Sequence, residues 1–185
     1  EYASSINEDS PTNRIITSLY TKDRILFLLK YGICYKTTTN KDGITQIEKH
    51  IMRYPQMFAT MAIRDKLREG IRKGVIWHTQ GSGKTALAYS NVRYLTDYFS
   101  REEGKIAKFY FIVDRLDLAE QAKSEFEARG LNVKMIKDKK QFIDDIVNPG
   151  ESNTSGKTTM TVLNIQKFSK ESVTKPADYN VNVQR

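Results

Sequence analysis

The stretch GVIWHTQGSGKTALAYSNVRYL, Gly74 to Leu95, constrains the fold of this chain more than any other feature. An apolar run, expected to form a strand over Gly74–His78, leads into a glycine-rich turn and then into a helix expected over Lys84–Ser100. Glycines let the backbone bend so that successive N–H groups point into one concavity, and the helix N-terminus adds partial positive charge. Such a concavity suits phosphate, so the stretch predicts a phosphate-binding loop.

The candidate ligand-binding residues of this loop are Thr79, Gln80, Gly81, Ser82, Gly83, Lys84 and Thr85. Lys84, the candidate catalytic residue, would reach the β- and γ-phosphates, and the Thr85 hydroxyl would ligate Mg²⁺. The pattern GxxxxGK[ST] asks for glycine where this chain has His78, a departure that matters little for the phosphate cradle. The alternative is a Gly-Lys turn without a ligand. His78 could sense nucleotide or be structural, and Trp77 is predicted to lie in the core.

The second half of the chain alternates short apolar runs with segments of helix length. The expected elements are strand Lys108–Val113, helix Leu116–Arg129, strand Asn132–Ile136, helix Lys140–Ile146 and a strand near Thr159–Leu163. This alternation is typical of a parallel sheet covered by helices on both faces. We therefore predict the α/β fold class, preceded by a small helical segment.

That preceding segment begins with a short helix over residues 21–30, followed by the strand-like YGICYK and a turn at residues 40–43. Ile44, Ile47 and Ile51 recur at three and four residues, which predicts a helix up to Arg53. A further helix is expected from Pro55 to a stop at Gly70.

The composition is that of a folded globular protein: 185 residues, 39% of them hydrophobic, and a net charge of +8. The positive charge favours a polyanionic partner, although a basic surface that only maintains solubility is the alternative. Cys34, the only cysteine, is predicted to be a buried structural thiol in a reducing compartment. No apolar stretch reaches the roughly 18 to 20 residues of a membrane span, so no membrane partner is expected.

The sequence contains three further motifs, HTQGSGKT, FIVDRLDL and IQKFS, and the upstream stretch KHIMRYPQMFATMAI. In these motifs it resembles the motor (R) subunit of type I restriction enzymes, a branch of the superfamily 2 DNA translocases. The resemblance runs from about Leu19 to Arg185. It implies a helical lead-in with an adenine-reading element over 21–73 and an incomplete first RecA-like ATPase domain over 74–185. Residues 1–20 are predicted to be a linker or tail, because the first 13 residues are polar and turn-rich. The resemblance also implies the cofactors ATP and Mg²⁺, a double-stranded DNA substrate, methylation and specificity subunits as partners, and a prokaryotic cytoplasm.

The resemblance assigns further residues. Arg115, in the place of helicase motif Ia, would contact a DNA phosphate, and Asn164 and Gln166 would make similar polar contacts at the end of a strand. The alternative for Arg115 is an ion pair with Asp117 at a helix start.

Upstream of the loop, RYPQ resembles the adenine-reading element of the family. Gln56 would pair with the adenine edge, because an amide offers both a donor and an acceptor, and Tyr54 or Arg53 would stack on or brace the nucleotide. A polar residue merely near a helix start is the alternative for Gln56. The base-reading role predicts a preference for ATP over GTP.

An acidic DExH word, which a superfamily 2 ATPase needs to hold Mg²⁺ and orient the attacking water, is absent from the 185 residues. Asp144 and Asp145 are adjacent but lie in a helix pattern. In the family the acidic word would follow Arg185 and a nuclease domain would lie upstream, so we expect a middle fragment that binds ATP weakly and neither hydrolyses it, translocates nor cuts DNA.

Three other functions stay open. Another superfamily 2 DNA or RNA helicase would share the loop and the basic charge but carry different words elsewhere. A nucleotide kinase is disfavoured, because no lid or second substrate site is recognisable. A non-enzymatic ATP-gated DNA clamp is the third.

Overall fold

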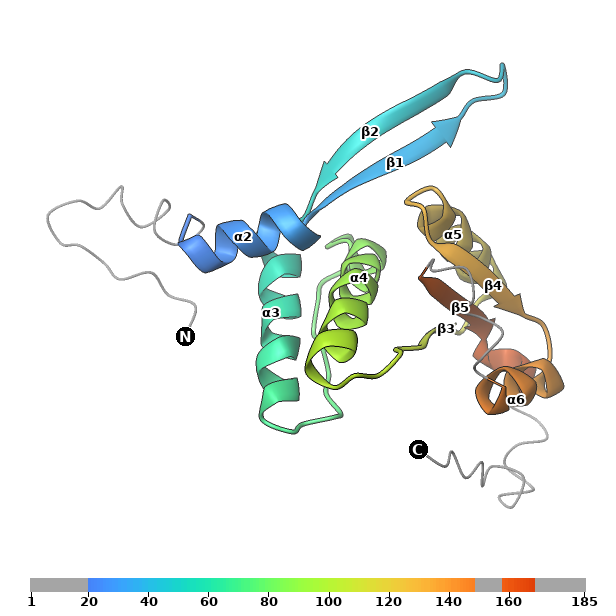
Figure 1. Cartoon of the computed structure of the whole chain (residues 1–185). Coiled ribbons are helices and arrows are strands. Elements are labelled where there is room, and N and C mark those ends of the chain that lie inside the picture. The colour runs from blue at the N-terminus through green and yellow to red at the C-terminus, as the bar shows by residue number, and fades with distance from the viewer. Residues whose placement is uncertain (1–19, 149–157, 169–185) are drawn as a thin grey trace, which may run out of the picture. The chain divides into compact units, whose positions relative to one another are not determined.

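The computed structural model describes residues 20–148 and 158–168 (Figure 1). The chain divides into two compact units, Glu1–Leu95 and Thr96–Arg185, and the division falls inside one long helix. The elements are α2 (Lys22–Tyr31), β1 (Ile33–Thr39), β2 (Thr45–Ile51), α3 (Tyr54–Arg68), α4 (Lys84–Glu102), β3 (Phe109–Val113), α5 (Leu116–Glu127), β4 (Asn132–Ile136), α6 (Lys139–Val147), β5 (Thr159–Asn164) and the 3-10 turn η2 (Ile165–Phe168).

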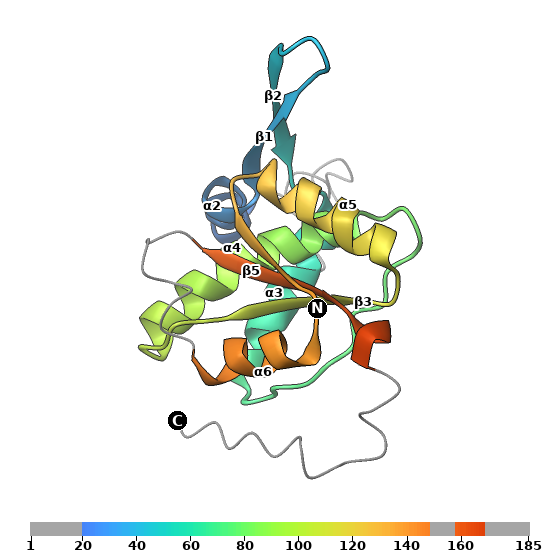
Figure 2. The same cartoon turned by 90° about the vertical axis from the view of Figure 1, so that its right-hand side faces the viewer.

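The second unit is built on a parallel three-stranded sheet of order β3-β5-β4. Consecutive side chains of a strand point to opposite faces, and β3 shows this directly. The ring of Phe111 packs against Phe126 of α5 at 5.2 Å, whereas Tyr110 packs against Phe142 of α6 at 5.4 Å. The two helices therefore cover opposite faces of the sheet (Figure 2), which confirms the predicted α/β class.

Strand β5 is the centre of this sheet. It pairs with β3 on one side and β4 on the other, and all six of its residues are buried, with Val162 fully inaccessible. A strand that is buried on both faces and paired at both edges must avoid charged side chains, and TMTVLN contains none, with Met160, Val162 and Leu163 as its apolar residues.

The first unit contains α2, the β1–β2 hairpin, α3 and the N-terminal part of α4. Aromatic rings of α2 and α4 pack together, with Tyr94 at 5.5 Å from Phe27 and 5.1 Å from Tyr31. Arg93 of α4 donates to the backbone oxygens of Ile33 and Lys30, at 2.6 and 3.2 Å, where α2 ends and β1 begins. These contacts hold α4 against the C-terminal end of α2, beyond which the hairpin projects (Figure 1).

The hairpin corrects the predicted helix over residues 44–53. β2 pairs antiparallel with β1 from Thr39–Thr45 to Ile33–Ile51. The predicted turn is present: Asn40 Oδ1 accepts the N–H groups of Asp42 and Ile44, and Gly43 has a φ of 78°. The turn returns the chain along β1, so cross-strand pairing overrides the helical spacing of the isoleucines. The region predicted as a helical lead-in thus contains a β-hairpin.

The predicted strand over Gly74–His78 is also wrong. Residues 71–79 form neither a helix nor a strand, and no described strand pairs with them. The expected core position of Trp77 is wrong as well: Trp77 is 91% exposed and Val75 is 88% exposed.

Cys34 is only partly buried, not the buried thiol predicted, because it lies in a hairpin that no third described strand joins. The other predicted elements are confirmed with end shifts of one to three residues, and strand Asn132–Ile136 has the predicted bounds. The predicted tail, apart from Tyr20, and the last 17 residues lie outside the described residues.

Candidate phosphate-binding site

The loop between residues 79 and 85 folds around one carbonyl group. Thr79 O accepts the Ser82 N–H at 3.3 Å and the Ser82 hydroxyl at 2.7 Å. Gly81 and Gly83 have φ values of 75° and 83°, a region that residues with a Cβ rarely adopt. The two glycines therefore permit the tight turn that leads into α4.

Helix α4 begins at Lys84, and its first hydrogen bond runs from Leu87 N to Gly83 O. The backbone N–H groups of Lys84, Thr85 and Ala86 precede this ladder and have no partner within the helix. Such groups and the partial positive charge of the helix start attract an anion. The described loop therefore has a geometry that suits an anion such as phosphate.

Lys84 lies across the loop. Its Nζ donates to His78 O and Thr79 O, each at 3.0 Å. An ammonium group is a mobile point charge with three donors, so it can exchange these neutral carbonyls for phosphate oxygens. The preceding His78 carries a buried Nδ1 that has no hydrogen-bond partner among the described residues.

Gln56 lies in the first turn of α3 and contacts the loop. Its Nε2 donates to Gly83 O at 3.1 Å and to Ser82 O at 3.4 Å, and its Oε1 accepts the Arg53 N–H at 2.9 Å. Arg53 is the exposed N-cap residue of α3, and Tyr54 is exposed beside Phe58. The structure brings the RYPQ word to the loop, but the amide of Gln56 already has loop and backbone partners.

The residues present fit a phosphate group better than an isolated metal ion. The described residues contain no group of three His, Cys, Asp or Glu that could hold a metal. Thr85 is the one candidate metal ligand that the sequence predicted.

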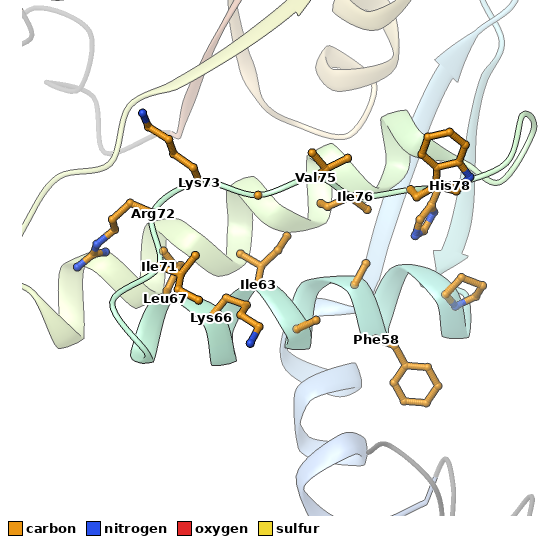
Figure 3. A pocket seen from close by; sticks show the side chains of 15 residues that line it. Phe58, Ile63, Lys66, Leu67, Ile71, Arg72, Lys73, Val75, Ile76 and His78 are labelled. Atoms are coloured by element: carbon orange, nitrogen blue, oxygen red, sulfur yellow. The ribbon is translucent and has the colours of Figure 1, made fainter.

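A hydrophobic cavity of about 740 Å³ lies between α3 and the extended segment 71–78 (Figure 3). Ile63 and Leu67 line it from the helix, while Ile71 and Ile76 line it from the segment, and it reaches His78 just before the loop.

The predicted DNA-contacting residues lie in the second unit. Arg115 is the N-cap residue of α5, and its Nη2 and Nε lie 2.6 and 3.1 Å from the Asp117 carboxylate, the ion pair considered as the alternative. The hydrogen bond from Arg115 lowers the pKa of Asp117. Asn164 is buried at the end of β5, where its Oδ1 accepts the N–H of the exposed Gln166 at 2.8 Å.

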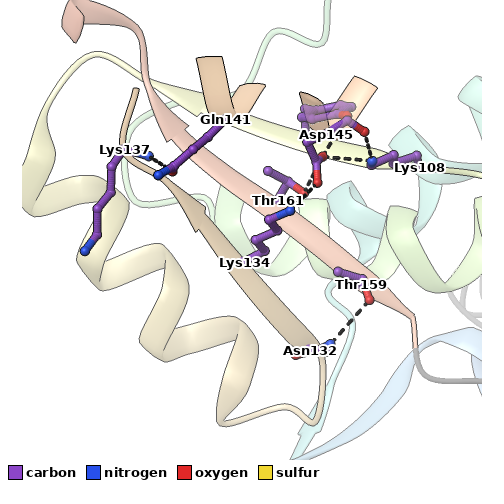
Figure 4. Close-up of polar contacts among 9 residues, drawn as sticks. Lys108, Asn132, Lys134, Lys137, Gln141, Asp145, Thr159 and Thr161 are labelled. Atoms are coloured by element: carbon purple, nitrogen blue, oxygen red, sulfur yellow. Dashed lines mark hydrogen bonds and ion pairs between the residues drawn. The ribbon is translucent and has the colours of Figure 1, made fainter. Parts of the chain in front are cut away.

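A charge cluster around the buried carboxylate of Asp145, which we call the Asp145 cluster, was not among the sequence predictions (Figure 4). The Asp145 carboxylate lies 2.8 Å from Lys108 Nζ and 2.7 Å from Lys134 Nζ, and it accepts the Tyr110 hydroxyl at 2.9 Å. Burial raises the pKa of Asp145, but hydrogen bonds from Lys108, Lys134 and Tyr110 outweigh it, so the pKa lies below its usual range. Burial and the same carboxylate raise the pKa of Tyr110 far above its ordinary value. No local pattern marks the cluster, because its members come from three separate segments: Lys108 and Tyr110 at β3, Lys134 of β4 and Asp145 of α6.

The chain is similar to a known protein family. Residues 49–183, most of the chain, match the family described as "Type III restriction enzyme, res subunit", and the chain belongs to this family. The match includes the loop, α3 and the parallel sheet.

Individual relatives make the likeness more specific. The chain is 36% identical over 109 residues to a Methanocaldococcus jannaschii protein, and 39% identical over 75 residues to a Staphylococcus saprophyticus protein, both named as type I restriction enzyme endonuclease subunits. The matches cover 56% and 40% of this chain and 10% and 8% of those proteins. The chain therefore spans about a tenth of the length of these relatives.

Among its described helices, none combines the length and apolar character needed to cross a membrane.

Proposed function

We propose that this chain binds the triphosphate of ATP at residues 79–85 and is the ATP-binding part of a restriction-enzyme motor subunit. The single observation that carries the proposal is the loop: two glycines with positive φ lead into a helix start whose free N–H groups lie next to Lys84. Membership of the restriction-subunit family supports the same function.

Each loop residue has a task in this proposal. The backbone N–H groups of Gly83, Lys84 and Thr85 bind phosphate oxygens, with Thr79, Gln80, Gly81 and Ser82 shaping the turn. Lys84 leaves the carbonyl groups of His78 and Thr79 and neutralises the outer phosphates. Bound Mg²⁺ would bridge phosphate oxygens and neutralise their charge, and the Thr85 hydroxyl would hold it.

A binding titration of the 185-residue chain with labelled MgATP tests the proposal. Lys84→Ala should lower the affinity by at least about tenfold, because a charged contact to phosphate is lost. Lys41→Ala, which removes the same charge from the exposed hairpin turn, is the matched control and should bind like the unchanged chain. Equal affinity of the Lys84→Ala chain and the unchanged chain would refute the site.

Binding without turnover is the second part of the proposal. The 185 residues contain no DExH word to orient a water, so MgATP with duplex DNA should give no phosphate release above a protein-free blank. DNA-stimulated release that Lys84→Ala abolishes would contradict this expectation.

The wider activity is proposed from the relatives. The complete protein would couple ATP hydrolysis to translocation on double-stranded DNA and to Mg²⁺-dependent cleavage, in a cytoplasmic complex with methylation and specificity subunits. The names of the relatives, type I endonuclease subunits, support this proposal. In this chain Arg115, Asn164 and Gln166 stay the predicted DNA contacts. Arg115 would have to exchange Asp117 for a DNA phosphate.

A further inference from the structure

Gln56 is buried, 5% exposed, and both ends of its amide contact the backbone. Its Oε1 accepts the N–H of Arg53 within the first turn of α3. Its Nε2 donates to the carbonyl groups of Ser82 and Gly83, so both loop contacts lie on the donor side of the amide. The side chain thus fastens the start of α3 to the phosphate loop.

Gly83 is shaped around this contact. A Cβ added at Gly83 would lie 2.4 Å from Gln56 Nε2, closer than real Cβ contacts, whereas a Cβ added at Gly81 would meet nothing within 4 Å. Both glycines have positive φ. Position 81 therefore needs glycine for its backbone conformation alone, and position 83 needs it for the approach of the Gln56 amide as well.

The two loop carbonyls matter because a peptide unit is planar, and in the trans form its C=O and N–H point in opposite directions. Holding the Ser82 carbonyl directs the Gly83 N–H away from Gln56, and holding the Gly83 carbonyl directs the Lys84 N–H in the same way. The Gly83 carbonyl also accepts Leu87 N at 3.0 Å, the first hydrogen bond of α4. Gln56 therefore helps fix two donors of the proposed phosphate cradle.

The anchor itself is rigid. One turn along α3, Thr60 is fully buried, and its hydroxyl oxygen lies 3.0 Å from Gln56 O and 2.8 Å from Asn91 Oδ1 of α4. Met57, between Gln56 and Thr60, is buried too. The start of α3 is thus fixed against α4, and the amide is presented to the loop from a fixed position.

We infer that Gln56 is a positioning residue for the phosphate loop, and that it acts on the triphosphate of any nucleotide, not on the adenine base. The inference rests on the proposed phosphate-binding function and deepens it. Base reading needs the amide hydrogens for the adenine edge, and in this structure they serve the loop carbonyls.

The test is the affinity of Gln56→Met and Gln56→Glu for MgATP, MgGTP and magnesium tripolyphosphate. Methionine has a similar length but no donor, and glutamate places a carboxylate against two carbonyl oxygens. We expect Gln56→Met to weaken all three ligands by about tenfold, in equal proportion, and Gln56→Glu to weaken them more. Gln121→Met, an exposed glutamine of α5, is the matched control and should leave all three unchanged.

A second measurement needs no ligand and separates positioning from mere packing. Amide NMR of the ligand-free chain should show shifted Gly83 and Lys84 resonances in Gln56→Met, while Val162→Ala, which loosens the core around β5, should lower the unfolding temperature without that shift. The loop shift and the equal loss for three ligands together support the inference.

Three results would overturn it: a loss confined to MgATP, no loss for any ligand, or unchanged Gly83 and Lys84 resonances. Failure of the unchanged chain to bind any of the three ligands would refute the proposed function instead, and the ligand-free spectra would still decide the role of Gln56.

Discussion

Strand β5 and the segment 74–78 are both short runs without Asp, Glu, Lys or Arg, yet among the described residues only β5 has neighbouring strands. β5 is paired on both edges and buried along its whole length. Segment 74–78 pairs with no described strand, and Val75 and Trp77 are exposed almost completely. Extended structure therefore depends on partners more than on composition, because strand stability comes from cross-strand pairs and burial.

The largest expected effect comes from placing a charge in each run. Val162→Asp buries a carboxylate at a position with no exposed surface, so we expect a loss of about 4 kcal/mol or more and no cooperative unfolding of the second unit. Val75→Asp should change stability by less than about 0.5 kcal/mol. Urea denaturation followed by circular dichroism measures both. A similar loss at Val75 would show that segment 74–78 is packed.

The second-largest effect on stability is expected for the Asp145 cluster. Asp145→Asn leaves Lys108, only 17% exposed, without its carboxylate partner, so we expect a loss of about 3–5 kcal/mol. Asp144→Asn, at the exposed neighbouring position, is the matched control and should lose less than about 0.5 kcal/mol. Thermal unfolding compares the two variants. Equal stabilities would show that the Asp145 cluster does not stabilise the fold.

The pH dependence of the second unit should follow the same carboxylate. The folded-state pKa of Asp145 is depressed, so its stabilising contribution is present above the unfolded value of about 3.9 and is lost as pH falls through the lower folded value. The unchanged chain should therefore lose stability below about pH 4, and Asp145→Asn should lose less over that range. Denaturation at several pH values measures the difference, and parallel curves would argue against the cluster.

The smallest effect is expected at Trp77, the only tryptophan of the chain. Its indole is 91% exposed, so its fluorescence should be that of a hydrated indole and be readily quenched by acrylamide. Trp77→Ala should change stability by less than about 0.5 kcal/mol. Emission shifted to the blue and protected from the quencher would contradict the exposure of segment 74–78.

Patterns within one element were enough to predict most of this fold. The spacing of apolar residues gave α5, β4 and α6 almost to the residue, and the contiguous loop word gave the positions of Gly81, Gly83 and Lys84. Local chemistry decides these features, since turn residues and helix starts act within a few positions of each other.

Features that depend on distant partners were not predicted. Segment 74–78 was predicted as a strand from its composition, although a strand also needs a neighbour. Ile44, Ile47 and Ile51 fit a helix, but the turn before them pairs β2 with β1. The contacts of Asp145 and the approach of Gln56 to Gly83 join residues 11 to 37 positions apart, and no single stretch of sequence displays them.

The position of Lys84 in the described loop affects how any substitution there is interpreted. Its ammonium group cross-links the ligand-free loop through the carbonyl groups of His78 and Thr79. Removing the side chain therefore alters the free state as well as the bound state, and the measured change in affinity is a difference between the two. Because the bound state loses its phosphate contact while the free state loses two internal hydrogen bonds, the affinity loss understates the strength of the contact between lysine and phosphate.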